Sequence, residues 1–206
     1  MYTPKYNQEK DWNTIAAFIR ENSFAMLVNT APDGVPLATH LPVELVEKTA
    51  GEFVLQGHIA KINPQWESFT TGTTLVVFTA PHAYISSSWY EKDKIPTWNY
   101  IAIHVYGQIR IQETAELQHS LEQLMNRYEA ASAHPVHMRD IDDKTLHNNL
   151  KAIVGFELTI TEVNARYKLS QNRNDRDYAS VVTHLKEAGG ENALQIAAEM
   201  EKRRKL

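Results

Sequence analysis

A ten-residue segment, residues 57–66, combines the residue types that hold a phosphate group. It reads Gly-His-Ile-Ala-Lys-Ile-Asn-Pro-Gln-Trp. Asn63 is a preferred N-cap residue and Pro64 is favoured at the first helical position, so a helix is expected to begin there, directly after a strand. Its unpaired amides, the ammonium of Lys61 and a further donor on His58 at the strand exit would then face one point. The alternatives are a phosphate cradle and an ordinary capped helix beside a solvated lysine.

Two further segments offer the groups that a flat, polar ring system needs. Thr39, His40 and Leu41 lie in an otherwise apolar stretch, where the first two could hydrogen-bond a heterocycle or be satisfied in the core. Trp98 and Asn99 end a stretch in which aromatic residues alternate with hydroxyl and amide groups. Aromatic faces stack on rings, but tryptophan and tyrosine are also enriched at dimer interfaces, so both interpretations stay open.

A fourth segment, residues 167–173, is rich in hydrogen-bond donors. Lys168, Gln171 and Arg173 follow the last predicted strand. These side chains could clamp a phosphate or a carbonyl-rich ring, or they could form a solvated loop.

The sequence lacks the motifs of several common catalytic sites. It contains no cysteine, which excludes disulfides, thiolate catalysis and cysteine-bound metals. It also has no nucleophile elbow, no His-Glu-x-x-His pattern and no phosphate loop ending in Gly-Lys-Ser/Thr. His134, His137 and Asp140 lie close together in sequence, but Pro135 and the loop context favour surface histidines over a metal site. We therefore assign no catalytic residue and expect no metal.

The overall charge gives no general affinity for nucleic acids or anionic lipids. The formal net charge is -4 over 206 residues, and the only basic run is residues 202–205. Any binding to DNA is therefore expected to be indirect or to depend on that run. No stretch approaches the roughly 18 apolar residues of a spanning helix, and the first ten residues lack an apolar signal core, so we expect a cytoplasmic protein.

Hydrophobic periodicity and turn residues predict strands interrupted by helices. The predicted strands cover residues 24–29, 35–45, 52–56, 73–79, 97–111 and 153–163. The predicted helices cover residues 11–21, 115–130 and about 142–152, followed by two terminal helices separated by two glycines. Because the helices do not alternate strictly with about six strands, the pattern favours a mainly antiparallel α+β barrel over a parallel doubly wound sheet. Residues 1–165 are expected to form this domain, and residues 166–206 a polar loop and a helical extension packed on it.

Several of these segments together resemble the PaiB family of FMN-binding negative transcriptional regulators. The matching blocks are residues 1–4, 39–42, 57–66, 84–86, 96–100, 153–155 and 168–173. The resemblance implies the split β-barrel of pyridoxamine-phosphate oxidases and flavin reductases, and a homodimer with FMN between its subunits. It also implies a phosphate-binding role for Lys61. The expected FMN-binding residues are Thr39, His40, Leu41, His58, Lys61, Asn63, Trp98, Asn99, Lys168, Gln171 and Arg173.

The resemblance leaves three functions open. The first is an FMN-binding regulator that acts on DNA directly or through a partner protein. The second is a flavin-dependent oxidoreductase or flavin reductase, in which the cofactor carries the chemistry. The third is a haem-binding or haem-degrading protein, as some split-barrel relatives are.

Overall fold

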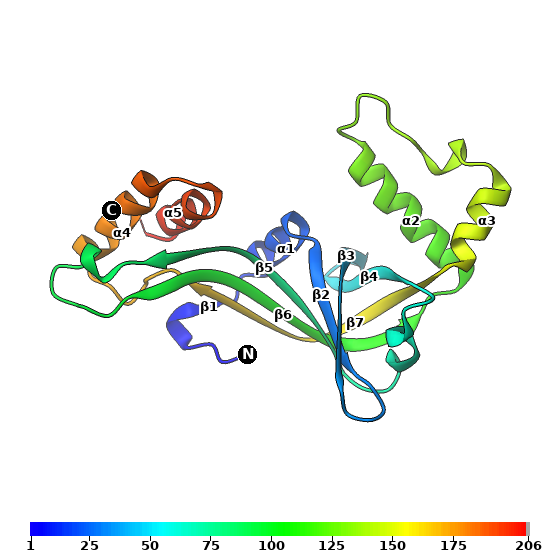
Figure 1. Ribbon diagram of the computed structural model, residues 1–206, viewed down its shortest axis with the longest axis horizontal. Helices are drawn as coiled ribbons and strands as arrows, with labels where there is room; N and C mark the ends of the chain where they lie inside the picture. Colours follow the sequence, from blue (N-terminus) through cyan, green and yellow to red (C-terminus); the bar gives the residue numbers. More distant parts are fainter. Residues whose placement is uncertain (205–206) are drawn as a thin grey trace. The chain divides into compact units, whose positions relative to one another are not determined.

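The computed structural model describes residues 1–204 and shows a closed antiparallel barrel with flanking helices (Figure 1). Seven strands form one sheet in the order β1-β7-β4-β3-β2-β5-β6, and β7 also pairs with β6. This second pairing closes six strands into a ring and leaves β1 outside it. The strands are β1 (Gln8–Glu9), β2 (Phe24–Thr30), β3 (Pro36–Thr49), β4 (Glu52–Ala60), β5 (Thr74–Ile85), β6 (Thr97–Ile111) and β7 (Ile153–Lys168). The predicted α+β fold with an antiparallel barrel is confirmed.

Five α-helices accompany the barrel in the described part of the chain. They are α1 (Trp12–Glu21), α2 (Thr114–Glu129), α3 (Asp143–Lys151), α4 (Asp175–Ala188) and α5 (Glu191–Arg203). Local chemistry sets their ends: Asp142 caps α3 by accepting the amide of Thr145 at 3.0 Å, and Asn174 caps α4 by accepting that of Asp177 at 2.8 Å. Gly189 and Gly190 separate α4 from α5, and both have the positive φ that favours glycine. No helix in residues 1–204 is long and apolar enough to span a bilayer, and the cytoplasmic location stays a prediction.

The barrel begins with the predicted hairpin of β2 and β3. Gly34, with φ +86°, donates its amide to the carbonyl of Ala31 at 2.9 Å and closes the turn. Pairing runs from Thr30 opposite Pro36 to Phe24 opposite Pro42. Alternate residues of both strands face the core, where Leu27 and Val43 are fully buried.

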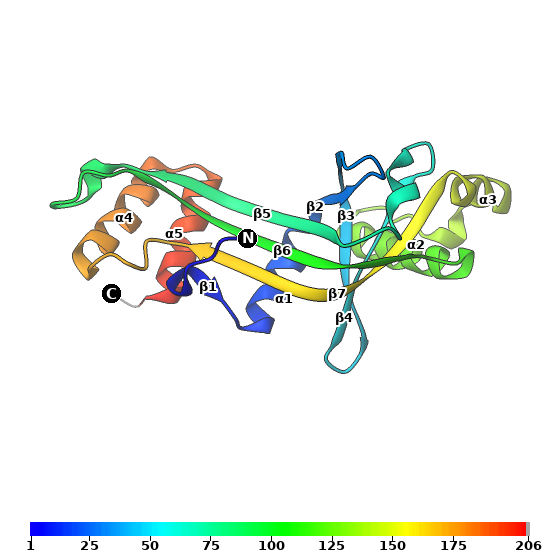
Figure 2. The same cartoon turned by 90° about the horizontal axis from the view of Figure 1, so that it is seen from below.

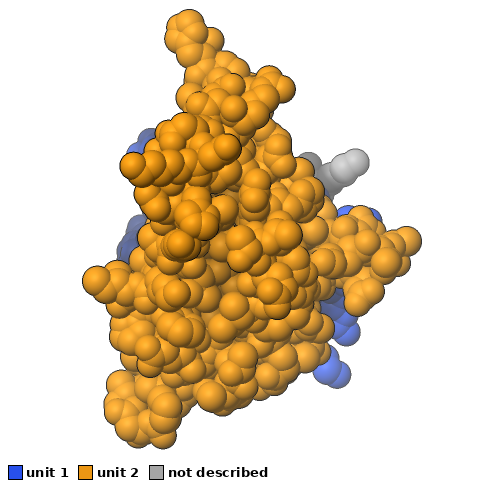
Figure 3. Space-filling view, turned by 90° about the vertical axis from the view of Figure 1, so that its right-hand side faces the viewer, with its two compact units in different colours: residues 1–18, 78–104, 164–206 blue, residues 19–77, 105–163 orange. Residues whose placement is uncertain are grey.

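The chain divides into two compact units, which Figure 3 colours separately. Unit 1 comprises residues 1–18, 78–104 and 164–206, and unit 2 comprises residues 19–77 and 105–163. Unit 2 holds α2, α3 and the strands β2, β3 and β4. In unit 1, α4 and α5 pack side by side (Figure 2), and the hydroxyl of Tyr178 donates to the carbonyl of Met200 at 2.8 Å. The expected division at residue 165 stays a prediction.

Of two local predictions around residues 52–66, the end of the strand was wrong and the start of the helix is confirmed. β4 continues to Ala60, so His58 lies within the strand and not at its exit. The strand continues because β7 pairs with it, placing Gly57 opposite Phe156. The short helix expected to begin at Asn63 is a five-residue 3-10 helix, η2 (Pro64–Ser68), with Asn63 as its N-cap and Pro64 in its first turn. A helix this short has no appreciable dipole, and a role of its backbone amides in binding phosphate stays a prediction.

Candidate functional site

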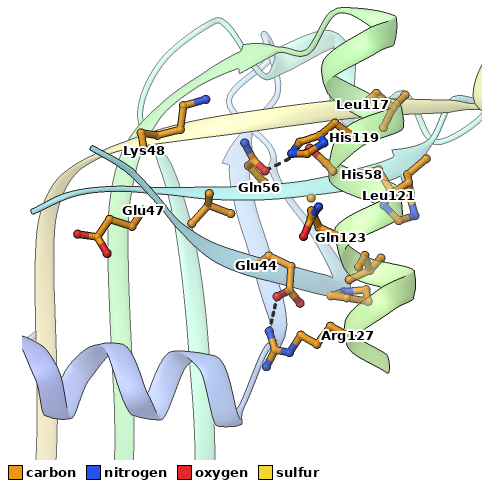
Figure 4. Close-up of a pocket in the computed structure, with 15 residues that line it drawn as sticks. Glu44, Glu47, Lys48, Gln56, His58, Leu117, His119, Leu121, Gln123 and Arg127 are labelled. Carbon is orange, nitrogen blue, oxygen red and sulfur yellow. Dashed lines mark hydrogen bonds and ion pairs between the residues drawn. The ribbon is translucent and has the colours of Figure 1, made fainter. Parts of the chain in front are cut away.

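A hollow of about 430 Å³ lies in unit 2 between α2 and the outer face of β3 and β4 (Figure 4). The pairing of β3 with β4 determines which side chains form the floor of this hollow. Glu44 pairs with Gln56, and because side chains alternate along each strand, both point away from the core that Val43 and Leu45 fill. Its wall on α2 includes Leu117, Leu121 and Leu124. The lining residues are Pro42, Glu44, Val46, Glu47, Lys48, Gln56, Gly57, His58, Leu117, His119, Ser120, Leu121, Gln123, Leu124 and Arg127.

The polar side chains of this first hollow include both paired and unpaired groups. Arg127 of α2 pairs with the carboxylate of Glu44 (Figure 4). The imidazole of His58, in contrast, is half-buried and has no hydrogen-bond partner among residues 1–204. Burial lowers the pKa of His58 below its usual value, so its imidazole is neutral near pH 7 and can both donate and accept. The first hollow can therefore take a partly apolar molecule with polar edges.

Beneath α2, a buried carboxylate joins four strands and the helix. Glu157 of β7 accepts from the Lys48 ammonium at 3.0 Å, the Gln56 amide at 2.8 Å and the Arg110 guanidinium at 2.9 Å. Burial alone would raise the pKa of Glu157, but these hydrogen bonds outweigh it and the pKa lies below its usual range. Arg110 also binds Glu116 of α2 and lowers the pKa of that carboxyl to about 2. This network fixes the scaffold of the hollow, and its groups are already paired.

A second hollow of unit 2, about 380 Å³, carries positive charge without acidic residues in its lining. Its basic lining residues are Lys61, which directly follows β4, and His147 and Lys151 of α3. Neither lysine ammonium has an acceptor among residues 1–204. The other lining residues are Trp66, Ile111, Gln112, Thr114, Leu117, Leu150, Ile153, Val154 and Gly155. An unpaired cationic lining of this kind suits an anionic ligand.

The backbone of Lys61 is held rigidly although its side chain is exposed. Its amide donates to the carbonyl of Ala152 at 2.8 Å, which continues the β4–β7 pairing by one residue. Its carbonyl accepts the indole N–H of Trp66 at 2.9 Å. These two hydrogen bonds therefore fix the backbone of Lys61 next to the C-terminal end of α3.

The structure brings Thr39 and Asn63 together through a residue that the sequence did not indicate. Asn63 donates to the hydroxyl of Thr39 at 3.0 Å, and Thr39 donates to the side chain of Gln65 at 2.5 Å. Gln65 is buried, and its backbone N–H donates to the side-chain oxygen of Asn63 at 3.0 Å. These three side chains hold η2 against β3. Among the neighbours, Leu41 is buried in the core, and His40 is exposed and stacks on Phe24.

The five remaining predicted residues lie in unit 1, and four of them, including Lys168, have their polar groups hydrogen-bonded within the chain. Asn99 is buried and donates to Ser170 at 3.0 Å. Gln171 donates to the carbonyl of Tyr167 and accepts the amide of Leu169 at 2.8 Å. Arg173 pairs with Asp93 and lies 4.1 Å from the ring centroid of Tyr90. These contacts give the donor-rich segment a clear role in folding.

Lys168 and Trp98 leave more of their surfaces available. Lys168 lines a hollow of about 160 Å³ in unit 1, and its ammonium donates to the hydroxyl of Thr97 and, at 2.8 Å, to the carbonyl of Trp98. Burial, with Arg166 and Arg173 nearby, lowers the pKa of the Lys168 ammonium. The indole of Trp98 is 52% exposed and packs edge-on against Tyr84. Ligand contact is therefore sterically open to these two residues.

Comparisons with known proteins agree on family and fold. The family described as "Putative FMN-binding domain" matches residues 1–162. The chain is 43% identical over 206 residues to "Protease synthase and sporulation protein PAI 2" of Bacillus subtilis, covering 98% of this chain and 97% of that protein. It is also 27% identical over 238 residues to the uncharacterized protein AN0679 of Emericella nidulans, covering 96% and 95% of the two chains.

Two solved structures share the fold at low sequence identity. The FAD and haem binding protein from Mycobacterium smegmatis has a TM-score of 0.59 at 17% identity, covering 90% of this chain and 81% of that one. The flavocytochrome Anf3 from Azotobacter vinelandii has a TM-score of 0.60 at 16% identity, covering 86% and 78%. These likenesses confirm the split-barrel fold, and the 43% identity to PAI 2 fixes the family. The chain belongs to the PaiB family of FMN-binding-domain proteins.

Proposed function

We propose that this protein binds FMN through unit 2, with the phosphate at Lys61. The observation that carries the proposal is the free ammonium of Lys61 at a hollow whose lining contains no carboxylate. A phosphate dianion offsets that charge, and a charge-assisted hydrogen bond to it contributes about 1.5–3 kcal/mol. Membership of the FMN-binding-domain family supports the same ligand.

The first hollow suits the ring system of the same cofactor. Its leucines from α2 offer apolar contact, and the neutral imidazole of His58 can bond a ring carbonyl or a ring nitrogen. His40 and Leu41 lie in β3, next to the strand that carries His58. When bound, FMN supplies one- and two-electron redox chemistry, while the protein contributes binding and orientation.

Thr39 and Asn63 take a supporting part in this proposal. Their hydrogen bonds to each other and to Gln65 fix η2, the segment that follows Lys61. In unit 1, Trp98 and Lys168 are proposed to reach the flavin of a second copy in a homodimer. Asn99, Gln171 and Arg173 would then act by shaping the loop that carries Lys168.

We propose that any regulatory role is exerted through a protein partner, because most of the cationic side chains at the C-terminus are already paired. Lys202 binds Glu199 at 2.5 Å, and Arg203 binds Glu9 at 2.6 Å. Arg204 binds Asp175 at 3.2 Å, and Lys205 lies outside the described residues. Paired cations contribute less to binding of the DNA backbone than free ones. Regulation through a partner protein fits this charge distribution better than direct binding to DNA.

Titration of flavin fluorescence tests the proposed ligand. Purified protein is mixed with FMN or riboflavin, and quenching and the visible spectrum are recorded. Saturable binding of FMN that is tighter than binding of riboflavin supports the proposal. Absence of binding to both flavins at millimolar protein would refute it. A gel-shift series at low salt, with and without residues 202–206, tests the regulatory part, and sequence-specific binding by either form contradicts the indirect role.

A further inference from the structure

The second hollow has a wall from α3 that no sequence motif indicated. His147 and Lys151 are one helical turn apart, so they lie on the same face of α3. Both line the hollow that Lys61 enters. The backbone amide of Lys61 donates to the carbonyl of Ala152 at 2.8 Å, so the backbone of Lys61 is bound to the residue that follows Lys151. Three basic side chains from two elements therefore converge on one hollow.

The charge balance of this hollow favours an anion. The end of α3 presents carbonyl groups, whose partial negative charge opposes a bound anion. A charge-assisted hydrogen bond from a lysine is stronger than the interaction with a helix end, so two lysines outweigh that opposition. The acidic residues of α3, Asp142 at its cap and Asp143, lie at the opposite end of the helix. The net effect is attraction for a compact dianion.

A buried amide in the same lining adds a hydrogen-bond acceptor. Gln112 is 7% exposed, and its side-chain nitrogen donates to Ser120 at 2.8 Å. Its side-chain oxygen is buried and has no donor within residues 1–204. A buried acceptor without a donor destabilises the folded state. A hydroxyl-bearing ligand is one source of the missing donor, so the lining suits a phosphate attached to a polyol.

From these three observations we infer that Lys151 and His147 bind the phosphate of FMN together with Lys61, and that the bound phosphate holds α3 against the end of β4. The inference rests on the proposed FMN binding. It adds His147 and Lys151 to the binding residues, and it gives the bound phosphate a role in stabilising the docked position of α3.

The effect on α3 follows from how weakly this helix is packed. None of its residues is buried, and it follows a largely exposed connection, residues 130–142. Segments with few buried apolar contacts open locally at low cost. A ligand that binds only the docked helix stabilises it by mass action. FMN should therefore protect α3, whereas riboflavin, which lacks the phosphate, should not.

Flavin affinity tests the two new binding residues against a matched control. The variants are Lys151→Gln and His147→Gln, and the control is Lys144→Gln, which removes a lysine of α3 that does not line the hollow. Fluorescence titration should show FMN binding about tenfold weaker in Lys151→Gln, corresponding to one lost charge-assisted contact. His147→Gln should weaken it by a smaller factor. Riboflavin affinity should be unchanged in all three variants, and the control should match the wild type.

Hydrogen exchange of the amides in residues 143–151 tests the docking of α3. FMN should slow exchange at least tenfold in the wild type and much less in Lys151→Gln, and inorganic phosphate alone should slow it partly. If Lys61→Gln weakens FMN binding and Lys151→Gln does not, the role of α3 is overturned while FMN binding stands. If riboflavin protects α3 as well as FMN does, the phosphate does not hold the helix. If the wild type binds neither flavin, the proposed function fails and this inference fails with it.

Discussion

Replacing Glu157 by glutamine should destabilise the barrel in a pH-dependent way. The side chain is 7% exposed and links Lys48, Gln56 and Arg110, which come from three other strands. Removing one partner of a buried ion pair costs about 3–5 kcal/mol as an upper bound. Lys48 and Arg110 are 42% and 45% exposed, so water compensates part of this loss. Glutamine also keeps one acceptor, so we expect a loss of about 1–3 kcal/mol at pH 7.

The sign of the pH dependence follows from the lowered pKa of Glu157. A carboxyl whose pKa is lower in the folded state stabilises the fold fully above its unfolded pKa, about 4.3. That contribution is lost as the pH falls through the folded pKa. The difference between wild type and Glu157→Gln should therefore be largest near pH 7 and shrink below pH 4. Urea unfolding followed by circular dichroism at both pH values measures it.

A matched control separates the network from general charge effects. Glu122→Gln removes an exposed carboxylate of α2 that has no partner in residues 1–204, and it should change the free energy of unfolding by less than about 0.5 kcal/mol. An equal loss in both variants, or a Glu157→Gln difference that grows on acidification, would contradict the reasoning.

Three further outcomes are expected. Lys61→Ala should weaken FMN binding by about tenfold to a hundredfold and leave riboflavin affinity nearly unchanged, and a parallel loss for both flavins would point to damage of the fold instead. Gly107→Ala should lower the melting temperature strongly, because a Cβ there would lie 2.2 Å from the carbonyl oxygen of Thr159, and an unchanged melting curve would show that the strands can separate without cost. Light scattering at micromolar concentration should give the mass of a dimer, and a stable monomer would remove the proposed contribution of Trp98 and Lys168 to a second copy's flavin.

Periodic patterns predicted the elements well where local sequence decides them. The alternation of residues 97–111 matches β6, and Asp142 caps α3 as expected. The length of β4 was underestimated because Gly57 and His58 are typical of a strand end. A non-local partner extends the strand: Phe156 of β7 lies opposite Gly57, and its ring comes within 2.8 Å of the position that a Cβ on Gly57 would occupy. Only a glycine fits there, and the sequence alone does not reveal the neighbour that requires it.

The candidate site could be predicted only in part, because the sequence shows local motifs but not which distant residues meet in the fold. Lys61 stood out because of its local motif, whereas Lys151 is about ninety residues away and reaches the same hollow through the pairing of β4 with β7. At Gln171 and Arg173 the sequence shows donors that could bind a ligand, and the structure shows that both side chains have partners within the chain. Their acceptors, the Tyr167 carbonyl and the Asp93 carboxylate, are set by the tertiary fold. Sequence shows which groups can bind, but the fold decides which of them are already paired.

Leu117 of α2 gives the two hollows of unit 2 a common wall. It is buried and lines both of them. A Cβ on Gly155 would lie 2.7 Å from its Cδ1 atom, so the first turn of α2 sits directly on the glycine. The amide of Gln112 donates to the carbonyl of Gly155 at 2.9 Å and fixes the same place. Because the interior is close-packed, displacement of this turn must change the shape of both hollows together. The first and second hollows therefore share a wall that is held in place by Gly155 of β7.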